Sequence, residues 1–199
     1  MRYNIITIER EYASGGSEIG QKLAEKLSIP CHGKDILDKA SEKMRLPVNN
    51  AQYIEETITD SFLYGLYMRA SQPIEKMQSI ASAQMLSRSE AEVIEELAAT
   101  GPCVMVGHCA AGVLRERKDV LRVFIYSNHN TRKDRTISVY RHESKEAEGI
   151  IRQFDKRRAN YYKANVGVDW KEPSNYHMML DSGLLGLDTV VDLLYQCVR

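Results

Sequence analysis

A run of small residues between an apolar segment and a helical pattern carries the clearest chemistry in the chain. Ser14-Gly15-Gly16-Ser17 follows the apolar run Ile5–Ile8 and precedes the helical pattern Gln21–Leu27. Small residues let a phosphate group approach backbone N–H groups, and the start of the following helix adds partial positive charge. The layout therefore predicts a strand, a phosphate-binding loop and a helix. A tight strand-to-helix turn without a ligand is the alternative.

The loop departs from the usual phosphate-binding pattern at one position. In GxxxxGK[ST] a lysine follows the last glycine and contacts the β- and γ-phosphates, whereas here Gly15 is followed by Gly16 and then Ser17. Phosphoryl transfer depends on positioning and on the neutralisation of negative charge. If the loop serves catalysis, another cation must therefore replace the lysine, and Arg10, just before the loop, is a candidate.

A dinucleotide-binding fingerprint is a second interpretation of the same glycines. Gly15–Gly20 misses GxGxxG because Ser17 stands where the second glycine would let the backbone approach a pyrophosphate. Asp35 and Asp38 lie roughly where a ribose-binding acid is expected, but they fall within a helical pattern instead of ending a strand. The dinucleotide interpretation is therefore the weaker one.

Strand-like runs alternate with helical patterns along the chain, which predicts a parallel sheet with crossover helices. Cys103–Val106 and Val123–Tyr126 are short, apolar and rich in β-branched residues, as expected of central strands covered on both faces. Further strands are predicted at Asn4–Ile8, Ile29–His32 and His177–Leu180, and a C-terminal helix is predicted from Leu187 to Cys197.

Residues 35–100 contain no strand-like run and are predicted to form a mostly helical insertion. Apolar residues recur at helical spacing between Ile54 and Leu66. Ser87–Glu90 matches the start of a helix, because a serine able to cap free amides is followed three residues later by a glutamate.

The bulk composition limits the classes of function. The 199 residues, 43% of them hydrophobic, suffice for one sizeable core, and we expect a single domain over residues 1–199. The 27 basic and 27 acidic side chains give a formal net charge of zero, so no general attraction for nucleic acid or for a membrane surface is predicted. The four cysteines lack disulfide or metal-ligand spacing, which favours a reduced, cytoplasmic setting. No oligomeric state is indicated.

Further motifs join the loop in a resemblance to a known family. They are Val106-Gly107-His108-Cys109-Ala110, the strand Val120–Tyr126, Asp155-Lys156-Arg157-Arg158-Ala159 with Tyr161-Tyr162 following, and Asp181-Ser182 before the last helix. Together with Ile6–Leu27 they resemble the cytidylate kinase-like family, a branch of the P-loop nucleoside monophosphate kinases. The resemblance spans nearly the whole chain. It implies an α/β three-layer P-loop kinase fold, a parallel sheet flanked by helices, with a helical acceptor-binding insertion at about 35–100 and an arginine-bearing lid at about 141–172.

The resemblance also implies roles for the loop residues. Ser14, Gly15 and Gly16 would hold the phosphates of ATP, and the hydroxyl of Ser17 would bind Mg²⁺. Gly16 takes the place of the lysine, as it does in this branch of the family. Glu18 is a further candidate for the cofactor site; an acid there favours the helix N-terminus but would repel a bound anion.

Arginines of the charged helical segment are candidates for the missing positive charge. Kinases of this kind close an arginine-bearing lid over the transferring phosphate, and guanidinium groups suit phosphate oxygens. Arg157 and Arg158 therefore join Arg10 as candidate catalytic residues. A solvated helix face is the alternative for the two lid arginines, and an exposed loop arginine is the alternative for Arg10.

The acceptor side departs from the family pattern. The resemblance leads us to expect Gly-Arg after the strand Cys103–Val106 and an Asp a few residues later, but the chain has Gly107-His108 and Ala111. His108 is a candidate substrate-binding residue, and a packed structural histidine is the alternative. Lys34 and Lys39 are candidates for contact with an acceptor phosphate, with surface lysines as the alternative.

These observations predict a phosphotransferase that uses ATP and Mg²⁺ and acts on a small phosphorylated or hydroxyl acceptor. The resemblance points to CMP or dCMP, although the loss of the expected Arg and Asp weakens the case for cytosine. The alternative is a nucleotide- or phosphate-sensing module that has kept the loop and lost the catalytic charges. The expected partner is a nucleotide in both cases.

Overall fold

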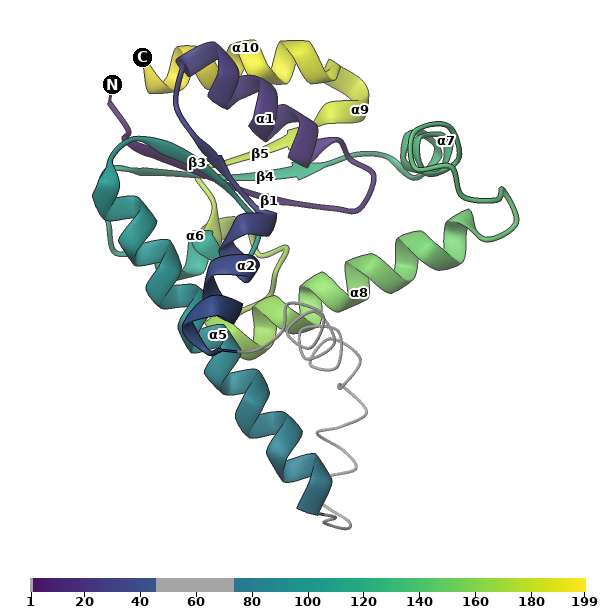
Figure 1. The fold of residues 1–199 in the computed structure, drawn as a ribbon. Helices are drawn as coiled ribbons and strands as arrows, with labels where there is room; N and C mark the ends of the chain where they lie inside the picture. Colours follow the sequence, from purple (N-terminus) through teal and green to yellow (C-terminus); the bar gives the residue numbers. More distant parts are fainter. Residues whose placement is uncertain (1, 46–73) are drawn as a thin grey trace.

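A computed structural model describes residues 2–45 and 74–199. A five-stranded sheet lies between two layers of helices in a three-layer α/β arrangement (Figure 1). The helices on one face are α1 (Gly16–Leu27) and α10 (Leu187–Val198), and those on the other face are α5 (Ile74–Thr100), α6 (Ala110–Val113) and α8 (Ala147–Val166).

All five strands run parallel, in the order β2-β3-β1-β4-β5. They are β1 (Ile5–Arg10), β2 (Cys31–His32), β3 (Cys103–Val106), β4 (Val120–Tyr126) and β5 (Met178–Asp181). Because β1 is the middle strand, the loop that follows it lies at the centre of the carboxyl edge of the sheet. Open parallel sheets bind their ligands at this edge.

The two faces of β1 contribute to two separate cores. Successive residues of a strand point to opposite faces, so Ile6 and Ile8 pack against α1 and α10, while Ile5 packs against α5 and α6. All three isoleucines are fully buried. The apolar runs in the sequence are therefore explained by a sheet that is covered on both faces.

The remaining elements connect these layers. They are α2 (Lys34–Lys43), α7 (His129–Ser138), α9 (Ser182–Leu185) and a 3-10 turn at Pro173–Asn175. α8 runs from beside α7 to beneath the sheet (Figure 1), where Tyr161 and Tyr162 are buried in an aromatic cluster with Phe124 and Trp170. Within residues 2–45 and 74–199, no helix has both the length and the apolar character needed to cross a membrane.

The predicted strands and the C-terminal helix are confirmed, with small differences at their ends. Of the predicted insertion, α2 and α5 are helical, and the pattern between Ile54 and Leu66 lies outside the described residues. The helix start predicted at Ser87–Glu90 is wrong, because α5 continues through it. Ser89 and Glu90 are buried instead, and the Ser89 hydroxyl donates to the Ala40 carbonyl. The single-domain division and the lid boundaries stay predictions.

Candidate functional site

The loop between β1 and α1 has the backbone shape of a phosphate cradle. Gly15, which precedes α1, has a φ of +80°, in the left-handed region that favours glycine. A Cβ added there would lie 2.6 Å from Cδ2 of Leu187, so the end of the Leu187 side chain would have to move. The first N–H groups of α1 have no partner within the helix. They lie at the central edge of the sheet and suit a phosphate.

The glycine in the lysine position is required by the packing of Arg10. A Cβ added at Gly16 would lie 2.4 Å from Cβ and 2.9 Å from Cγ of Arg10. Real Cβ atoms essentially never approach other atoms so closely. A lysine at position 16 is therefore incompatible with the present position of Arg10. The shortest of these contacts is with Cβ, an atom that every residue except glycine has, so a side chain at position 16 conflicts with any non-glycine residue at position 10 in the present backbone.

The Arg10 side chain connects the loop with the end of β3. Its Nε lies 3.4 Å from Oγ of Ser17, at the first turn of α1. Its Nη1 lies only 2.0 Å from the position that a Cβ of Gly107 would take. The first carbons of the Arg10 side chain thus lie against Gly16, and its guanidinium occupies space that Gly107 leaves open. A permanent positive charge lies between the phosphate loop and the edge where an acceptor is expected.

Arg158 of α8 holds the backbone of the same segment. Its Nη1 donates to the carbonyl oxygen of Arg10 (2.9 Å), and its guanidinium lies 5.8 Å from the ring centroid of Tyr12. Burial, and to a smaller extent repulsion from Arg10, lowers the pKa of Arg158 to about 9. The side chain therefore stays charged at neutral pH, and two guanidinium groups share the site.

A buried ion-pair network supports the loop from α7 and α8. Nη1 of Arg132 lies 2.8 Å from Oε2 of Glu11, and Nε of Arg132 donates to the Tyr12 carbonyl (2.8 Å). Asp155 accepts a hydrogen bond from the Tyr12 N–H (2.8 Å) and pairs with Arg132. Lys171 also pairs with Glu11. The peptide groups of Tyr12 are thereby fixed from both sides, so these charges position the loop.

Ser14 lies in the candidate phosphate cradle and also helps to hold the loop in its conformation. Its side chain is buried, and its hydroxyl donates to the carbonyl of Glu11 (2.9 Å). Its own carbonyl accepts a hydrogen bond from the Ser182 hydroxyl at the start of α9 (2.5 Å). The side chain of Ser14 therefore stabilises the turn, which leaves its backbone as the part that could meet a phosphate.

Arg135 of α7 is a further cation beside the loop that was not among the residues predicted from the sequence. Its Nη2 donates to Oε2 of Glu18 (2.9 Å) and lies 3.5 Å from the position of a Cβ on Gly15. Lys22 lies 3.6 Å from the other oxygen of Glu18. The negative charge of Glu18 is thus countered, which reduces its repulsion of an anion. The one signal in the sequence is spacing, because Arg132 and Arg135 share a helix face.

A buried acid, Glu9, lies under the site near the end of β1. It is 5% exposed, and its Oε1 has no hydrogen-bond partner among the described residues. Burial raises the pKa of the Glu9 carboxyl, and the charges of Arg10, His108 and Arg158 act in the opposite direction. One buried carboxyl group is therefore close to three groups that carry or can carry positive charge.

His108 follows β3 in a strained backbone. Gly107, His108 and Cys109 all have positive φ, at 80°, 55° and 58°, and such strain at non-glycine residues often occurs at functional sites. Nδ1 of His108 lies 2.8 Å from Oε1 of Glu90. The Tyr161 hydroxyl donates to the other Glu90 oxygen. Glu90 is 1% exposed, so a buried carboxylate holds both rings. In the sequence, Glu90 matched the pattern of a helix start, so its contacts with His108 and Tyr161 were not predicted.

The other predicted site residues are Arg157, Lys34 and Lys39, and Ala111 stands where the resemblance led us to expect an Asp. The Arg157 guanidinium lies 5.8 Å from the Phe154 ring on the same helix. Lys34 and Lys39 are exposed on α2. Ala111 is buried in α6 and can donate no hydrogen bond from its side chain. The binding and catalytic roles of Arg157, Lys34 and Lys39 stay predictions.

The residues present fit the phosphates of ATP and offer one ligand for Mg²⁺. The Gly15–Ser17 backbone would form the cradle, and Gly15 has the positive φ that favours glycine. Mg²⁺ commonly takes one or two protein oxygens, with phosphate oxygens and water completing its shell. The Ser17 hydroxyl would be such a ligand. In the described ranges, no group of three or more His, Cys, Asp or Glu residues could hold a metal by itself.

Comparison with solved structures places this arrangement in a known fold. An uncharacterized protein from Eubacterium ventriosum superimposes with a TM-score of 0.72 at 22% identity, covering 98% of this chain and 97% of that one. A shikimate kinase from Bacteroides thetaiotaomicron gives a TM-score of 0.54 at 14% identity, covering 98% and 97% of the two chains. A shikimate kinase from Acinetobacter baumannii, in complex with shikimate, gives 0.53 at 16%, covering 98% and 93%. The fold is that of the P-loop kinases.

Comparison of sequences gives the family. No curated protein matches the chain. The model of the cytidylate kinase-like family matches residues 5–184, a range that includes the loop, the Gly107–His108 turn, α8 and Asp181-Ser182. The match covers far more than half of the chain, and it confirms the resemblance seen in the motifs. The chain belongs to the cytidylate kinase-like family.

Proposed function

We propose that this protein transfers the γ-phosphoryl group of ATP to a small acceptor. The observation that carries the proposal is the packing of Arg10 against Gly16 and Gly107, beside Ser17. A loop that had only lost its lysine would lack a cation at the phosphates. Here an arginine enters the same region from the end of β1, and the glycine is the residue that makes room for it.

Each part of the site has a task in this reaction. The Gly15–Ser17 amides bind phosphate oxygens, and the Ser17 hydroxyl is the protein ligand for Mg²⁺. Mg²⁺ held there would supply neutralisation of the charge that develops during transfer. Arg10 adds positive charge on the side that faces β3, while Arg158 fixes the Arg10 carbonyl. Phosphoryl transfer needs little more than positioning and charge stabilisation.

The proposed acceptor is a small phosphorylated or hydroxyl compound. CMP and dCMP follow from the family resemblance and are included in the test. The acceptor side of the site gives them little support, because His108 contacts the Glu90 carboxylate and Ala111 is buried.

A nucleotide-sensing module is the second candidate function. It is favoured by the use of Arg132 and Arg158 as supports of the loop backbone, since charges engaged in this way contribute less to a transition state. Such a module would bind ATP and leave it intact.

Calorimetric titration and a transfer assay separate the two functions. Mg²⁺-ATP is titrated into the protein, and transfer of γ-³²P is then followed at saturating ATP with nucleoside monophosphates and neutral hydroxyl compounds as acceptors. We expect ATP binding and acceptor-dependent transfer. Binding without transfer to any acceptor would support the sensing module, and absence of ATP binding would refute both functions.

A further inference from the structure

A pocket of about 330 Å³ lies between α5, α6 and α8, next to the end of β3. Its size is at the lower end of the range of about 300–1,000 Å³ usual for small-molecule sites. His108 forms part of its wall. The preceding residue, Gly107, is the one against which the Arg10 guanidinium packs. The pocket and the cation of the phosphate loop therefore meet at the two-residue turn Gly107–His108.

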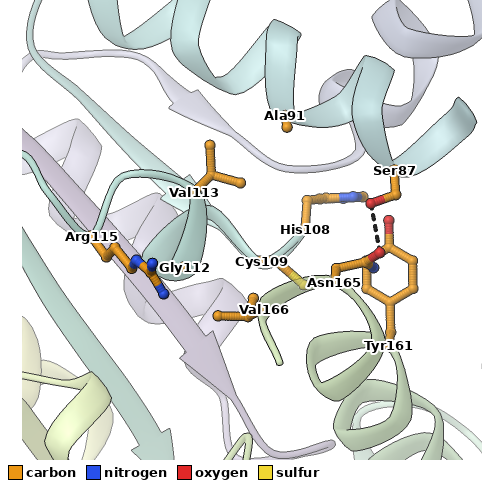
Figure 2. A pocket seen from close by; sticks show the side chains of 10 residues that line it. All are labelled: Ser87, Ala91, His108, Cys109, Gly112, Val113, Arg115, Tyr161, Asn165 and Val166. Carbon is orange, nitrogen blue, oxygen red and sulfur yellow. Dashed lines mark hydrogen bonds between the residues drawn. The ribbon is translucent and has the colours of Figure 1, made fainter. Parts of the chain in front are cut away.

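The polar groups of the pocket lie together at one end, as Figure 2 shows. They are the Ser87 hydroxyl from α5, the His108 ring, and the Tyr161 hydroxyl and Asn165 amide from α8. The Ser87 hydroxyl donates to Oδ1 of Asn165 (2.6 Å). Ser87 and Asn165 are neutral and can both donate and accept hydrogen bonds. Small and apolar side chains form much of the remaining wall.

The charge around the pocket disfavours a phosphate group. Glu90, which is 1% exposed, lies behind this polar end and contacts both His108 and Tyr161. Among the described residues that line the pocket, Arg115 is the sole lysine or arginine. It lies at the opposite end in Figure 2, is 61% exposed and bonds to Glu116 (3.1 Å). Phosphate recognition normally uses charged donors aimed at the oxygens. The polar end offers the neutral groups of Ser87, Asn165 and Tyr161, and the one group there that can carry positive charge, His108, is paired with the Glu90 carboxyl group.

We propose that this pocket binds the acceptor and that the acceptor is a neutral, hydroxyl-bearing ring compound, such as a sugar or a cyclitol. Its hydroxyl groups exchange hydrogen bonds with Ser87 and Asn165, and its apolar face lies against the apolar wall. One hydroxyl, directed past His108, reaches the phosphate bound beside Arg10. This inference rests on the proposed phosphotransferase function and names its substrate class.

The reaction balances without any further reactant. The oxygen of the acceptor hydroxyl forms a bond to the γ-phosphorus, and the bond between that phosphorus and the β–γ bridging oxygen breaks. ADP leaves with the electron pair. The hydroxyl proton is released to solvent, and the product is a phosphate monoester of the acceptor.

The test uses the full chain, Mg²⁺, [γ-³²P]ATP and two acceptor sets. One set holds hexoses, pentoses and cyclitols, and the other holds CMP, dCMP, UMP and AMP. We expect labelled product from at least one compound of the neutral set and none from the monophosphates. If ATP binds and no neutral compound is labelled, or if only a monophosphate is labelled, the inference is overturned while the proposed ATP site stands. If ATP does not bind, the proposed function itself fails.

Variants locate the acceptor in the pocket. Ser87→Ala and Asn165→Leu each remove one hydrogen-bonding group, so we expect the KM for the acceptor to rise about three- to tenfold and the KM for ATP to stay constant. Lys163→Ala, an exposed position on the same helix, is the matched control and should change neither. An unchanged acceptor KM in both pocket variants, with folding verified by circular dichroism, would show that the acceptor binds elsewhere.

Discussion

Replacement of Gly16 by lysine should damage the loop instead of repairing it. The added Cβ would lie 2.4 Å and 2.9 Å from two carbons of Arg10, and 3.3 Å from Cβ of Ile125. Because the first two contacts are below any normal separation, the loop or Arg10 must move. Overpacking of this kind typically costs about 1–3 kcal/mol of unfolding free energy. For a chain of this length that corresponds to a melting temperature about 2–12 °C lower.

The double variant Arg10→Gly/Gly16→Lys tests the reason for this loss. Removal of the Arg10 side chain eliminates the two shortest contacts and leaves only the Ile125 contact of 3.3 Å. We therefore expect the second substitution to cost much less in the Arg10→Gly background than in the wild type. The lysine then restores one positive charge at the phosphates. ATP affinity in the double variant should accordingly exceed that of either single variant.

The assays are thermal unfolding and calorimetric titration of Mg²⁺-ATP, analysed as a double-mutant cycle. Loss of a charged hydrogen bond costs about 1.5–3 kcal/mol, so Arg10→Gly should weaken ATP binding about ten- to hundredfold. Gly149→Lys is the control for added charge, because a Cβ there meets no atom within 4 Å. If Gly16→Lys alone tightens ATP binding and leaves the melting temperature unchanged, Arg10 does not occupy the place assigned to it.

Three further predictions concern the groups around the loop. Burial raises the pKa of Glu9 above its ordinary value of 4.5. The stability of the wild type relative to Glu9→Gln should therefore be greatest below pH 4.5 and fall as the pH rises through the raised pKa. Urea unfolding of both proteins between pH 4 and 8 measures this difference in stability, and a difference that stays constant over that range would contradict the prediction. Arg132→Met removes the ion-pair partner of Asp155 and one of the two cations that pair with the buried Glu11, while Lys171 remains as the other. Urea unfolding should therefore show a loss of about 3 kcal/mol, at the lower end of the range for breaking a buried ion pair, and a loss below about 1 kcal/mol would contradict the supporting role of the network. Arg158→Ala should lower kcat about a hundredfold through displacement of the loop backbone, with little change in the free energy of unfolding, and an unchanged kcat would exclude Arg158 from positioning.

The sheet could be predicted from the sequence because its signals are local. β3 and β4 are short apolar runs, and a strand covered on both faces needs no other pattern. The loop was predictable for the same reason, since glycines between a strand and a helix have few other uses. Arg10 could be named as a candidate from its position alone. The packing of Arg10 against Gly107 could not be predicted, because 97 positions separate the two residues in the sequence.

The groups that the sequence analysis missed have distant partners or ambiguous patterns. Arg132 and Asp155 contact Tyr12 across 120 and 143 positions. A single sequence does not indicate which residues so far apart lie in contact. Glu90 follows a serine by three residues, which is the spacing of a capping box and also the spacing of neighbours on any helix face. The contacts of Glu90 with His108 and Tyr161 show that it lies on a buried helix face and not in a capping box. The buried carboxylate behind His108 was therefore hidden by a pattern that had another meaning.

The central claim is that this loop transfers phosphate, with Arg10 as the cation in place of the lysine of the usual P-loop pattern. ³¹P NMR of Mg²⁺-ATP with the protein and the neutral acceptor set tests it most directly, because the γ-phosphate, ADP and a new phosphate monoester have separate resonances. We expect the γ resonance to decline as ADP and one monoester resonance grow in equal amounts, and we expect Arg10→Ala to slow this change strongly. An ATP spectrum that stays constant while calorimetry shows ATP bound would contradict the claim and leave a nucleotide sensor.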